Sequence, residues 1–317
     1  MKTVFLNAAK LDFDSKLDFS QLAGVTWFTK YDTSRNDEIL ERVRDQDIVI
    51  TKELPMGEEL IASFPSSVRL ICEAGTGYNN IDIATAREKG IAVCNVPGYS
   101  TEAVAQLAIT FMLSLSSSLA MQQRMIERRN LDNFSACLQV PHFEVLNKTL
   151  GVIGGGTIGQ QVMHVARSLG MKILVCTRTP KEWDDPGIRS ASLEELLGQS
   201  DFVTIHCPLT PDTKHLIDRE KLKLMKPSAY IINTSRGPII RETDLVDALR
   251  HGTIAGAALD VQDPEPPEPE NPLFDMENVI LTPHIGWKCS ETRQRLINLV
   301  TKNIDSFIQG KPLNVVN

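Results

Sequence analysis

Residues 149–159 of the chain read Thr149-Leu150-Gly151-Val152-Ile153-Gly154-Gly155-Gly156-Thr157-Ile158-Gly159. The apolar residues before the glycines predict a buried β-strand, and the residues after them, as far as Leu169, have the periodicity of a helix. Gly154, Gly156 and Gly159 follow the G-x-G-x-x-G spacing. Gly154 permits a tight turn, Gly156 lets backbone approach a pyrophosphate, and Gly159 lets the helix pack closely on the strand.

The helix that begins at Thr157 and Ile158 would direct unpaired N–H groups and the positive end of its dipole at an anion. We therefore predict a nucleotide-binding turn whose contacts are Gly154, Gly156, Thr157, Ile158 and Gly159. A purely structural strand–helix turn is the alternative for this motif taken alone.

The composition restricts the class of protein. A length of 317 residues suffices for two domains, and the net charge of −7 argues against a nucleic-acid partner. No run approaches the ~18 apolar residues of a membrane span, and residues 1–10 do not resemble a signal peptide. The six cysteines include no C-x-x-C pair, which favours buried free thiols over disulfides or a metal site. We expect a cytoplasmic protein without a metal.

Strand-like and helical segments alternate along the whole chain. This alternation predicts an α/β fold of two doubly wound parallel-sheet domains, one of the Rossmann type and one flavodoxin-like. The predicted strands are 4–6, 48–50, 70–72, 91–93, 150–153, 172–176, 202–205, 230–233, 254–259 and 279–281. The clearest helices are 37–44, 81–89, 101–128, 158–169 and 291–307.

The helices at 101–128 and 291–307 are interpreted as connectors between the domains. We predict a dinucleotide-binding domain over residues 101–283 and a substrate domain formed by residues 1–100 and 284–317. A second domain that runs continuously to residue 317 is the alternative. The proline-rich stretch 263–272 is predicted to be a loop, because strands flank it closely.

Three polar clusters directly follow predicted strands, which is where an open α/β sheet places its ligands. They are 233–237, 260–266 and 282–287, and they contain Arg236, Glu265 and His284. Each of these side chains could singly be an ordinary loop residue. Together they supply a carboxylate anchor, an acid/base group and a group that orients it.

An ordered set of motifs resembles the D-isomer-specific 2-hydroxyacid dehydrogenases across nearly the whole chain. The motifs are Gly75–Asp82 (GTGYNNID), the glycine turn, His206–Thr210 (HCPLT), Asn233–Gly237 (NTSRG), the Glu265 loop and Pro283–Trp287 (PHIGW). The Glu265 loop and the segment from Trp287 to Leu296 are most similar to the glycerate dehydrogenase (hydroxypyruvate reductase) branch. The resemblance implies NAD(P)H-dependent reduction of a small 2-oxo acid, such as hydroxypyruvate or glyoxylate, to the D-2-hydroxy acid.

The resemblance also implies roles for individual residues. Arg236 would hold the substrate's carboxylate and carbonyl oxygens with its planar fork of donors. The turn Gly75-Thr76-Gly77 would bring backbone N–H groups to the same carboxylate. His284 would be the acid in reduction and the base in oxidation, and Glu265 would orient its imidazole and favour the protonated form.

The predicted second strand of the nucleotide domain ends in Thr177-Arg178-Thr179, where NAD-preferring sites carry Asp or Glu. An arginine flanked by hydroxyls would attract a 2′-phosphate, so NADP is favoured over NAD. NAD bound through its pyrophosphate, with Arg178 solvated, is the alternative. The resemblance adds further cofactor contacts at Thr101, Cys207, Pro208, Thr234 and Asp260.

The apolar helix over 101–119 predicts a homodimer interface, with complete burial inside one chain as the alternative.

A second class of function also remains open, a dinucleotide-gated protein-binding scaffold like the C-terminal-binding-protein co-repressors. The sequence does not identify the physiological 2-oxo acid. Leu54, Tyr78 and Trp287 are candidates to line its pocket and are equally well explained as packing residues.

Overall fold

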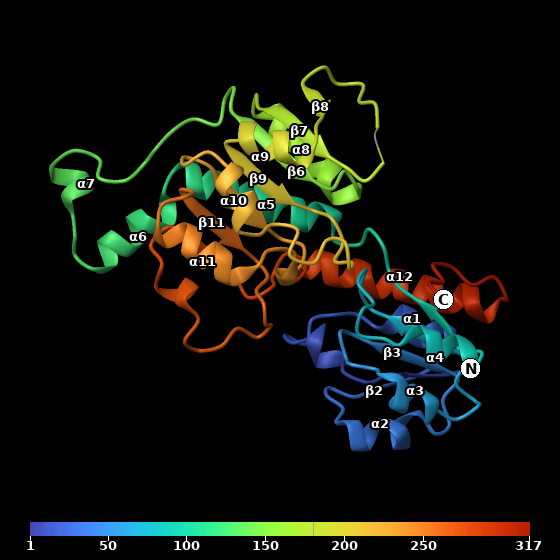
Figure 1. Cartoon of the computed structure of the whole chain (residues 1–317). Coiled ribbons are helices and arrows are strands. Elements are labelled where there is room, and N and C mark those ends of the chain that lie inside the picture. The colour runs from blue at the N-terminus through green and yellow to red at the C-terminus, as the bar shows by residue number, and fades with distance from the viewer. Residues whose placement is uncertain (180) are drawn as a thin grey trace. The chain divides into compact units, whose positions relative to one another are not determined.

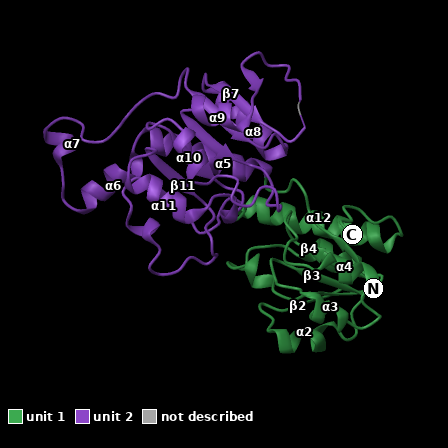
Figure 2. Ribbon diagram, in the orientation of Figure 1, with its two compact units in different colours: residues 1–100, 287–317 green, residues 101–286 purple. Residues whose placement is uncertain are grey.

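The structure is a computed structural model that describes residues 1–179 and 181–317. The chain divides into two compact units (Figures 1 and 2). Unit 1 is Met1–Ser100 with Trp287–Asn317, and unit 2 is Thr101–Gly286. Each unit has its own sheet and its own hydrophobic core.

Over its described residues, unit 1 contains a parallel five-stranded sheet in the order β2-β1-β3-β4-β5. This is the flavodoxin-like order, with its topological switch point between β1 and β3. The strands are β1 (Lys2–Phe5), β2 (Trp27–Lys30), β3 (Ile48–Thr51), β4 (Leu70–Glu73) and β5 (Ala92–Cys94). The helices are α1 (Ser20–Val25), α2 (Asn36–Val43), α3 (Glu58–Ala62), α4 (Ile83–Glu88) and α12 (Ser290–Ile308), with a short 3-10 turn η1 (Ala8–Lys10).

The sheet of unit 1 is buried on both faces, because successive strand residues pack into two different apolar clusters. Phe5, Ile48 and Ile50 pack with Leu22 of α1 and with residues of α12. The alternate residues, such as Val4 and Val49, pack against α2, α3 and α4. The strands therefore read as continuous apolar runs, as in other sheets that helices cover on both faces.

Unit 2 contains, over residues 101–179 and 181–286, a parallel seven-stranded sheet in the order β12-β11-β10-β9-β6-β7-β8. This is the doubly wound dinucleotide-binding order with one added strand, and the order reverses between β6 and β9. Its strands are β6 (Thr149–Ile153), β7 (Lys172–Cys176), β8 (Ile188–Ser190), β9 (Phe202–Ile205), β10 (Tyr230–Asn233), β11 (Gly256–Leu259) and β12 (Val279–Leu281). Both predicted sheets are confirmed as parallel α/β sheets.

Helices cover both faces of this second sheet. One apolar cluster joins α9 (Leu193–Gln199), α10 (Arg219–Leu224) and α11 (Glu242–Arg250) to the sheet, and the other joins α5 (Thr101–Ser116) and α8 (Thr157–Ser168). The remaining elements are α6 (Leu119–Glu127), α7 (Asp132–Ser135) and the short turns η2 (Gly237–Ile239) and η3 (Pro272–Asp275).

Two strands, β2 and β8, were not predicted. Both are edge strands, and their residues are mostly exposed; Trp27 of β2 is 82% exposed. A half-solvated strand of three or four residues lacks the continuous apolar run by which the central strands are recognised.

The prediction of a single helix over 101–128 is wrong, because the structure has two helices there, α5 and α6. The break falls in the run Ser116-Ser117-Ser118, where Ser118 has a left-handed φ of 46°. The Ser118 hydroxyl donates a hydrogen bond to the Pro141 carbonyl oxygen, so the side chain stabilises the turn that ends the apolar helix.

The boundary between the units falls after Gly286, three residues later than the predicted boundary after residue 283. The reason is local hydrogen bonding. The backbone N–H groups of His284, Ile285 and Gly286 all donate to Asp260, which follows β11 of unit 2. The assignment of nucleotide binding to one unit and substrate binding to the other stays a prediction.

The six cysteines all lie in the described part of the chain and are free thiols. Cys72 and Cys94 are buried and Cys176 and Cys207 are half-buried. The expectation of burial is wrong for the other two, Cys137 and Cys289, which are exposed because they lie outside the strands.

Among the described helices none alone is long and apolar enough to cross a membrane, although α5 and α6, bent by 63°, pass that test as a pair.

Candidate active site

The glycine turn after β6 requires glycine at two positions for the fold of the chain itself. Gly154 has a φ of +105°, and a Cβ there would lie 2.6 Å from the backbone nitrogen of Cys207. A Cβ on Gly159 would lie 2.0 Å from the Gly154 carbonyl oxygen. Both values are far below van der Waals contact, so α8 approaches the strand as closely as the motif predicts.

Gly156 differs from these two glycines, because a Cβ there would meet no described atom within 4 Å. It is the N-cap residue of α8, and the first helical hydrogen bond runs from the Gln160 N–H to the Gly156 carbonyl oxygen. The N–H groups of Thr157, Ile158 and Gly159 in the first turn therefore have no partner within the helix. Open space before a helix N-terminus is a suitable place for a pyrophosphate.

A second observation supports a ligand beside this sheet. The hydroxyl of Thr234, directly after β10, is buried and has no hydrogen-bond partner among the described residues. A buried hydroxyl without a partner costs free energy, on the order of 1–3 kcal/mol, unless a ligand or water satisfies it. The turn, the helix N-terminus and Thr234 together fit a bound dinucleotide.

The open space around Gly156 predicts that Gly156→Ala weakens coenzyme binding without lowering the stability of the protein. The melting temperature without coenzyme should stay within about 1 °C of wild type, because no described atom lies within 4 Å of the new Cβ. The Kd for the reduced coenzyme should rise at least about tenfold, because the methyl group prevents close approach of the phosphates. Gly24→Ala, which also meets no described atom, is the matched control for a harmless methyl. Unchanged coenzyme affinity in Gly156→Ala would remove the phosphates from this turn.

The other predicted cofactor residues lie on unit 2 as follows. Thr177 follows β7 and donates a hydrogen bond from its hydroxyl to the Thr179 carbonyl oxygen, and Arg178 and Thr179 are exposed. Thr101 is buried at the start of α5. Cys207 and Pro208 follow β9, and burial raises the pKa of the Cys207 thiol to about 11, which keeps it neutral. Their contacts with a cofactor stay predictions.

Arg236 lies in a turn that its own neighbours fix. Asn233, the buried last residue of β10, accepts a hydrogen bond from the Ser235 N–H at 3.0 Å and donates one to the Arg236 carbonyl oxygen at 2.9 Å. The half-buried guanidinium donates from Nη1 to the Ser235 carbonyl oxygen at 2.7 Å. A side chain held in this way is preorganised for bidentate binding of a carboxylate.

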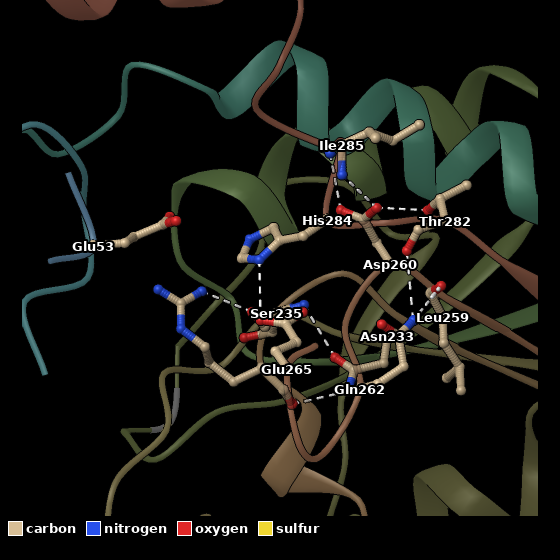
Figure 3. Close-up of polar contacts among 12 residues, drawn as sticks. Glu53, Asn233, Ser235, Leu259, Asp260, Gln262, Glu265, Thr282, His284 and Ile285 are labelled. Atoms are coloured by element: carbon tan, nitrogen blue, oxygen red, sulfur yellow. Dashed lines mark hydrogen bonds and ion pairs between the residues drawn. The ribbon is translucent and has the colours of Figure 1, made fainter. Parts of the chain in front are cut away.

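His284 and Glu265 lie side by side, and Figure 3 shows the line that joins them. The distance from His284 Nδ1 to Glu265 Oε2 is 3.3 Å, and their side chains are 25% and 36% exposed. His284 also has a left-handed φ of 51°, a conformation that is uncommon for residues other than glycine. Backbone strain of this kind is concentrated at functional sites.

The histidine of the HCPLT motif differs from His284 in its surroundings. His206 Nε2 lies 2.9 Å from the Thr204 hydroxyl, and burial lowers the pKa of His206 to about 4. Near pH 7 His206 is therefore neutral and cannot serve as an imidazolium acid. The partly exposed His284, beside a carboxylate, is the histidine suited to proton transfer.

Asp260 holds the segment that carries His284. It is 1% exposed, and its Oδ1 accepts hydrogen bonds from the Thr282 hydroxyl and the Ile285 N–H (Figure 3). Its Oδ2 accepts one from the Gly286 N–H. Burial raises the pKa of Asp260, and these donors oppose that shift because they favour the ionised form. The predicted contact between Asp260 and the cofactor stays a prediction, and its anchoring of this segment was not predicted.

The three candidate catalytic residues come from neighbouring strands. Arg236, Glu265 and His284 follow β10, β11 and β12, whose carboxyl ends lie at one edge of the sheet. The segments are also in direct contact, since a Cβ on Gly237 would lie 1.8 Å from the Gln262 carbonyl oxygen. The structure therefore brings the segments that carry Arg236, Glu265 and His284 together on unit 2, and the catalytic roles of these residues stay predictions.

The remaining predicted substrate residues lie on unit 1, directly after β4. The Thr76 hydroxyl donates to the Val96 carbonyl oxygen at 2.9 Å, and the Val96 N–H donates to the Gly75 carbonyl oxygen at 2.8 Å. These bonds fix the turn Gly75-Thr76-Gly77. Of the pocket candidates, Trp287 is 5% exposed in the apolar cluster of unit 1, and Tyr78 and Leu54 are half-buried.

Beneath this turn lies a buried ionic network that the sequence did not predict. The 2% exposed Lys52 has its Nζ 4.1 Å from the centroid of the Trp287 ring. Glu73 is fully buried, and burial raises its pKa to about 7 although Lys52 and hydrogen bonds oppose the shift. A Cβ on Gly75 would lie 3.2 Å from the Glu73 carboxylate and 3.3 Å from Lys52 Nζ. A glycine at this position therefore avoids crowding the network.

A doubly wound sheet with a nucleotide-type turn and an Arg–Glu–His set defines the class of protein, a dinucleotide-dependent oxidoreductase. Comparison with known proteins supports this assignment to the oxidoreductases. Residues 109–286 match the family model described as D-isomer specific 2-hydroxyacid dehydrogenase, NAD binding domain. The chain belongs to the D-isomer-specific 2-hydroxyacid dehydrogenase family.

Individual relatives cover the whole chain or most of it. A hydroxypyruvate reductase of Blautia hydrogenotrophica is 39% identical over 100% of both chains. A glyoxylate reductase of Thermococcus litoralis is 38% identical over 88% of this chain and 86% of its own. The solved structure of an acyclic imino acid reductase (Bsp5) in complex with NADPH and D-Arg is 27% identical, with a TM-score of 0.90 over 100% of both chains. These relatives are reductases, and the co-repressor alternative is not favoured.

Proposed function

We propose that this protein reduces a small 2-oxo acid of the hydroxypyruvate or glyoxylate type to the D-2-hydroxy acid, and catalyses the reverse reaction. The observation that carries the proposal is the His284–Glu265 pair beside the Arg236 turn, on the same sheet as a glycine turn that fits a dinucleotide. The hydroxypyruvate reductase of Blautia hydrogenotrophica and the glyoxylate reductase of Thermococcus litoralis, 39% and 38% identical to this chain, support the choice of substrate class.

The chain's own residues account for the charge that develops during the reaction. The reduced nicotinamide supplies the hydride when it is bound. Arg236 holds the substrate's carboxylate and the carbonyl oxygen, where charge develops, through charge-assisted hydrogen bonds worth roughly 1.5–3 kcal/mol each. Glu265 accepts a hydrogen bond from the His284 Nδ1–H, which leaves the Nε2–H of the imidazolium to deliver a proton to the alkoxide oxygen.

We propose that the backbone N–H groups of Gly75, Thr76 and Gly77 on unit 1 also donate to the substrate's carboxylate, and that unit 2 binds the nucleotide. The fixed geometry of that turn supports this assignment.

We also propose that the protein acts in the cytoplasm, and its six free thiols are consistent with a reducing compartment.

A substrate screen tests the proposed function. Hydroxypyruvate, glyoxylate, pyruvate and phenylpyruvate are each mixed with NADPH or NADH, and the loss of absorbance at 340 nm is followed. We expect the highest kcat/KM with hydroxypyruvate or glyoxylate. No oxidation of either coenzyme with any of the four acids would contradict the proposal.

We further propose that NADP is preferred over NAD. The support is Arg178, which is exposed just after β7 and flanked in the chain by Thr177 and Thr179, and the NADPH in the structurally similar imino acid reductase. Arg178→Ala should raise the KM for NADPH about tenfold or more and leave the KM for NADH within about twofold, because only NADPH carries the 2′-phosphate. Arg189→Ala, which removes an exposed cation on β8, is the control. An equal effect of Arg178→Ala on both coenzymes would contradict the preference.

The apolar helix that was predicted to form a homodimer interface is mostly buried within unit 2, since 10 of the 16 residues of α5 are buried. We therefore propose a homodimer in which residues 113–146 contribute to the interface. Large apolar side chains are exposed throughout this segment: Leu113, Leu119, Ile126, Leu131, Phe134, Leu138 and Leu146, with Phe134 76% exposed. So many exposed apolar side chains in one segment are typical of an interaction surface. Sedimentation equilibrium checks the state, with about 70 kDa expected for two 35.2 kDa chains.

A further inference from the structure

The loop that carries Glu265 has few ways to fix its own shape. Between Asp263 and Asn271 it contains Pro264, Pro266, Pro267 and Pro269. Proline has no backbone N–H, so none of these residues can donate a hydrogen bond that would hold the loop. The hydrogen bonds that hold this loop come from its other residues, such as the Asn271 N–H that donates to the Glu268 carbonyl oxygen at 3.0 Å, and from groups outside the proline run.

Glu242, the first residue of α11, holds both ends of this loop. Its Oε2 accepts a hydrogen bond from the Asp263 N–H at 3.1 Å, and its Oε1 accepts one from Asn271 Nδ2 at 2.6 Å. Asn271 is 8% exposed and also accepts the N–H of the buried Leu273 at 2.9 Å, which ties that end of the loop to the core. One carboxylate therefore closes the loop that carries Glu265.

Glu242 also connects this loop to the segment that carries Arg236. The short turn η2 separates Arg236 from α11, and Gly237 packs against the Gln262 carbonyl oxygen, one residue before Asp263. A change at Glu242 would thus act on the loop at the residue next to this contact. Glu265 lies only two residues further along and makes the 3.3 Å contact with His284.

We propose that Glu242 is a positioning residue for the reaction: by holding Asp263 and Asn271 it sets the Glu265 carboxylate against His284. This inference deepens the proposed function and rests on it for its kinetic consequence. Glu242 does not touch substrate or coenzyme in this account and acts only through Glu265. Ionisation matters, because a carboxylate offers an acceptor oxygen to each of the two donors.

The test uses Glu242→Gln, which keeps the size of the side chain but replaces one acceptor oxygen by an NH₂ group. We expect kcat with the preferred 2-oxo acid to fall about tenfold or more, with the KM for coenzyme within about twofold, because only the orientation of the acid/base pair is lost. Asp247→Asn is the matched control. Asp247 lies on the same helix, and its carboxylate is paired with Arg219 at 2.6 Å.

A double-mutant cycle with Glu265→Gln separates positioning from a general loss of structure. If Glu242 acts through Glu265, adding Glu242→Gln to Glu265→Gln should lower kcat by less than about twofold further. The same fold loss in both backgrounds, or an unchanged kcat in the single variant, would overturn the proposal. Asn271→Ala removes the other donor to Glu242 and should give the same pattern, which keeps the test open if Glu242→Gln does not fold.

A structural readout distinguishes failure of this inference from failure of the proposed function. Wild-type protein that oxidises no coenzyme with any 2-oxo acid defeats the proposed function only. In crystals of Glu242→Gln we expect the His284 Nδ1–Glu265 Oε2 contact to be broken, and in Asp247→Asn to be kept. An intact contact in Glu242→Gln would overturn the positioning role whatever the substrate.

Discussion

Replacing His284 by alanine is expected to lower kcat by at least about two orders of magnitude with affinity for the coenzyme nearly unchanged. Glu265 contacts the imidazole at Nδ1, and Asp260 anchors the segment that carries it, so in the proposed reaction Nε2 is a fixed proton donor. General acid–base catalysis by a positioned side chain is typically worth about 10²–10⁴-fold in rate. Steady-state kinetics with saturating coenzyme measure the loss, and fluorescence titration measures the Kd of the coenzyme.

His164→Ala is a suitable control for the loss of an imidazole, because His164 is exposed on α8. It should keep kcat within about twofold. Near-normal turnover in His284→Ala would show that another group moves the proton. His206 is a poor substitute for that role, because its pKa of about 4 leaves it neutral near pH 7.

Arg236→Lys is expected to lower kcat/KM for the 2-oxo acid by about 100-fold although the charge is conserved. A lysine ammonium is a point charge and cannot reproduce two parallel N–H donors, so one charge-assisted hydrogen bond, on the order of 1.5–3 kcal/mol, is lost. Both KM and kcat should change, since the carboxylate and the developing charge on the carbonyl oxygen are held by the same fork. Initial rates over a range of substrate concentrations separate the two effects.

Arg250→Lys is the matched control, because Arg250 is an exposed residue at the end of α11. That variant should behave like wild type. If Arg236→Lys also left KM and kcat unchanged, Arg236 would have no part in the site.

The central strands and the three candidate catalytic residues could be predicted from the sequence for one physical reason. Parallel strands buried on both faces are continuous apolar runs, and the residues that follow them meet at one edge of the sheet. Arg236, Glu265 and His284 each follow such a run. The edge strands β2 and β8 lack it, and the break at Ser118 depends on a hydrogen bond to Pro141 that no local pattern reveals.

The supporting residues could not be predicted, because their roles depend on contacts between distant segments. Glu242 meets Asn271 across 29 residues, and Asp260 meets Gly286 across 26. Lys52 and Glu73 form a buried network although each stands in or beside a strand of apolar residues. A charged residue in such a segment signals a buried polar network only when its partners are known.

The most direct test of the account is a crystal structure of the ternary complex with NADPH and oxamate, an unreactive analogue of a 2-oxo acid. We expect His284 Nε2 to lie within about 3 Å of the analogue's carbonyl oxygen, with Nδ1 still in contact with Glu265 and the Arg236 guanidinium bound to the carboxylate. An imidazole turned away from that oxygen and out of hydrogen-bond reach would contradict it.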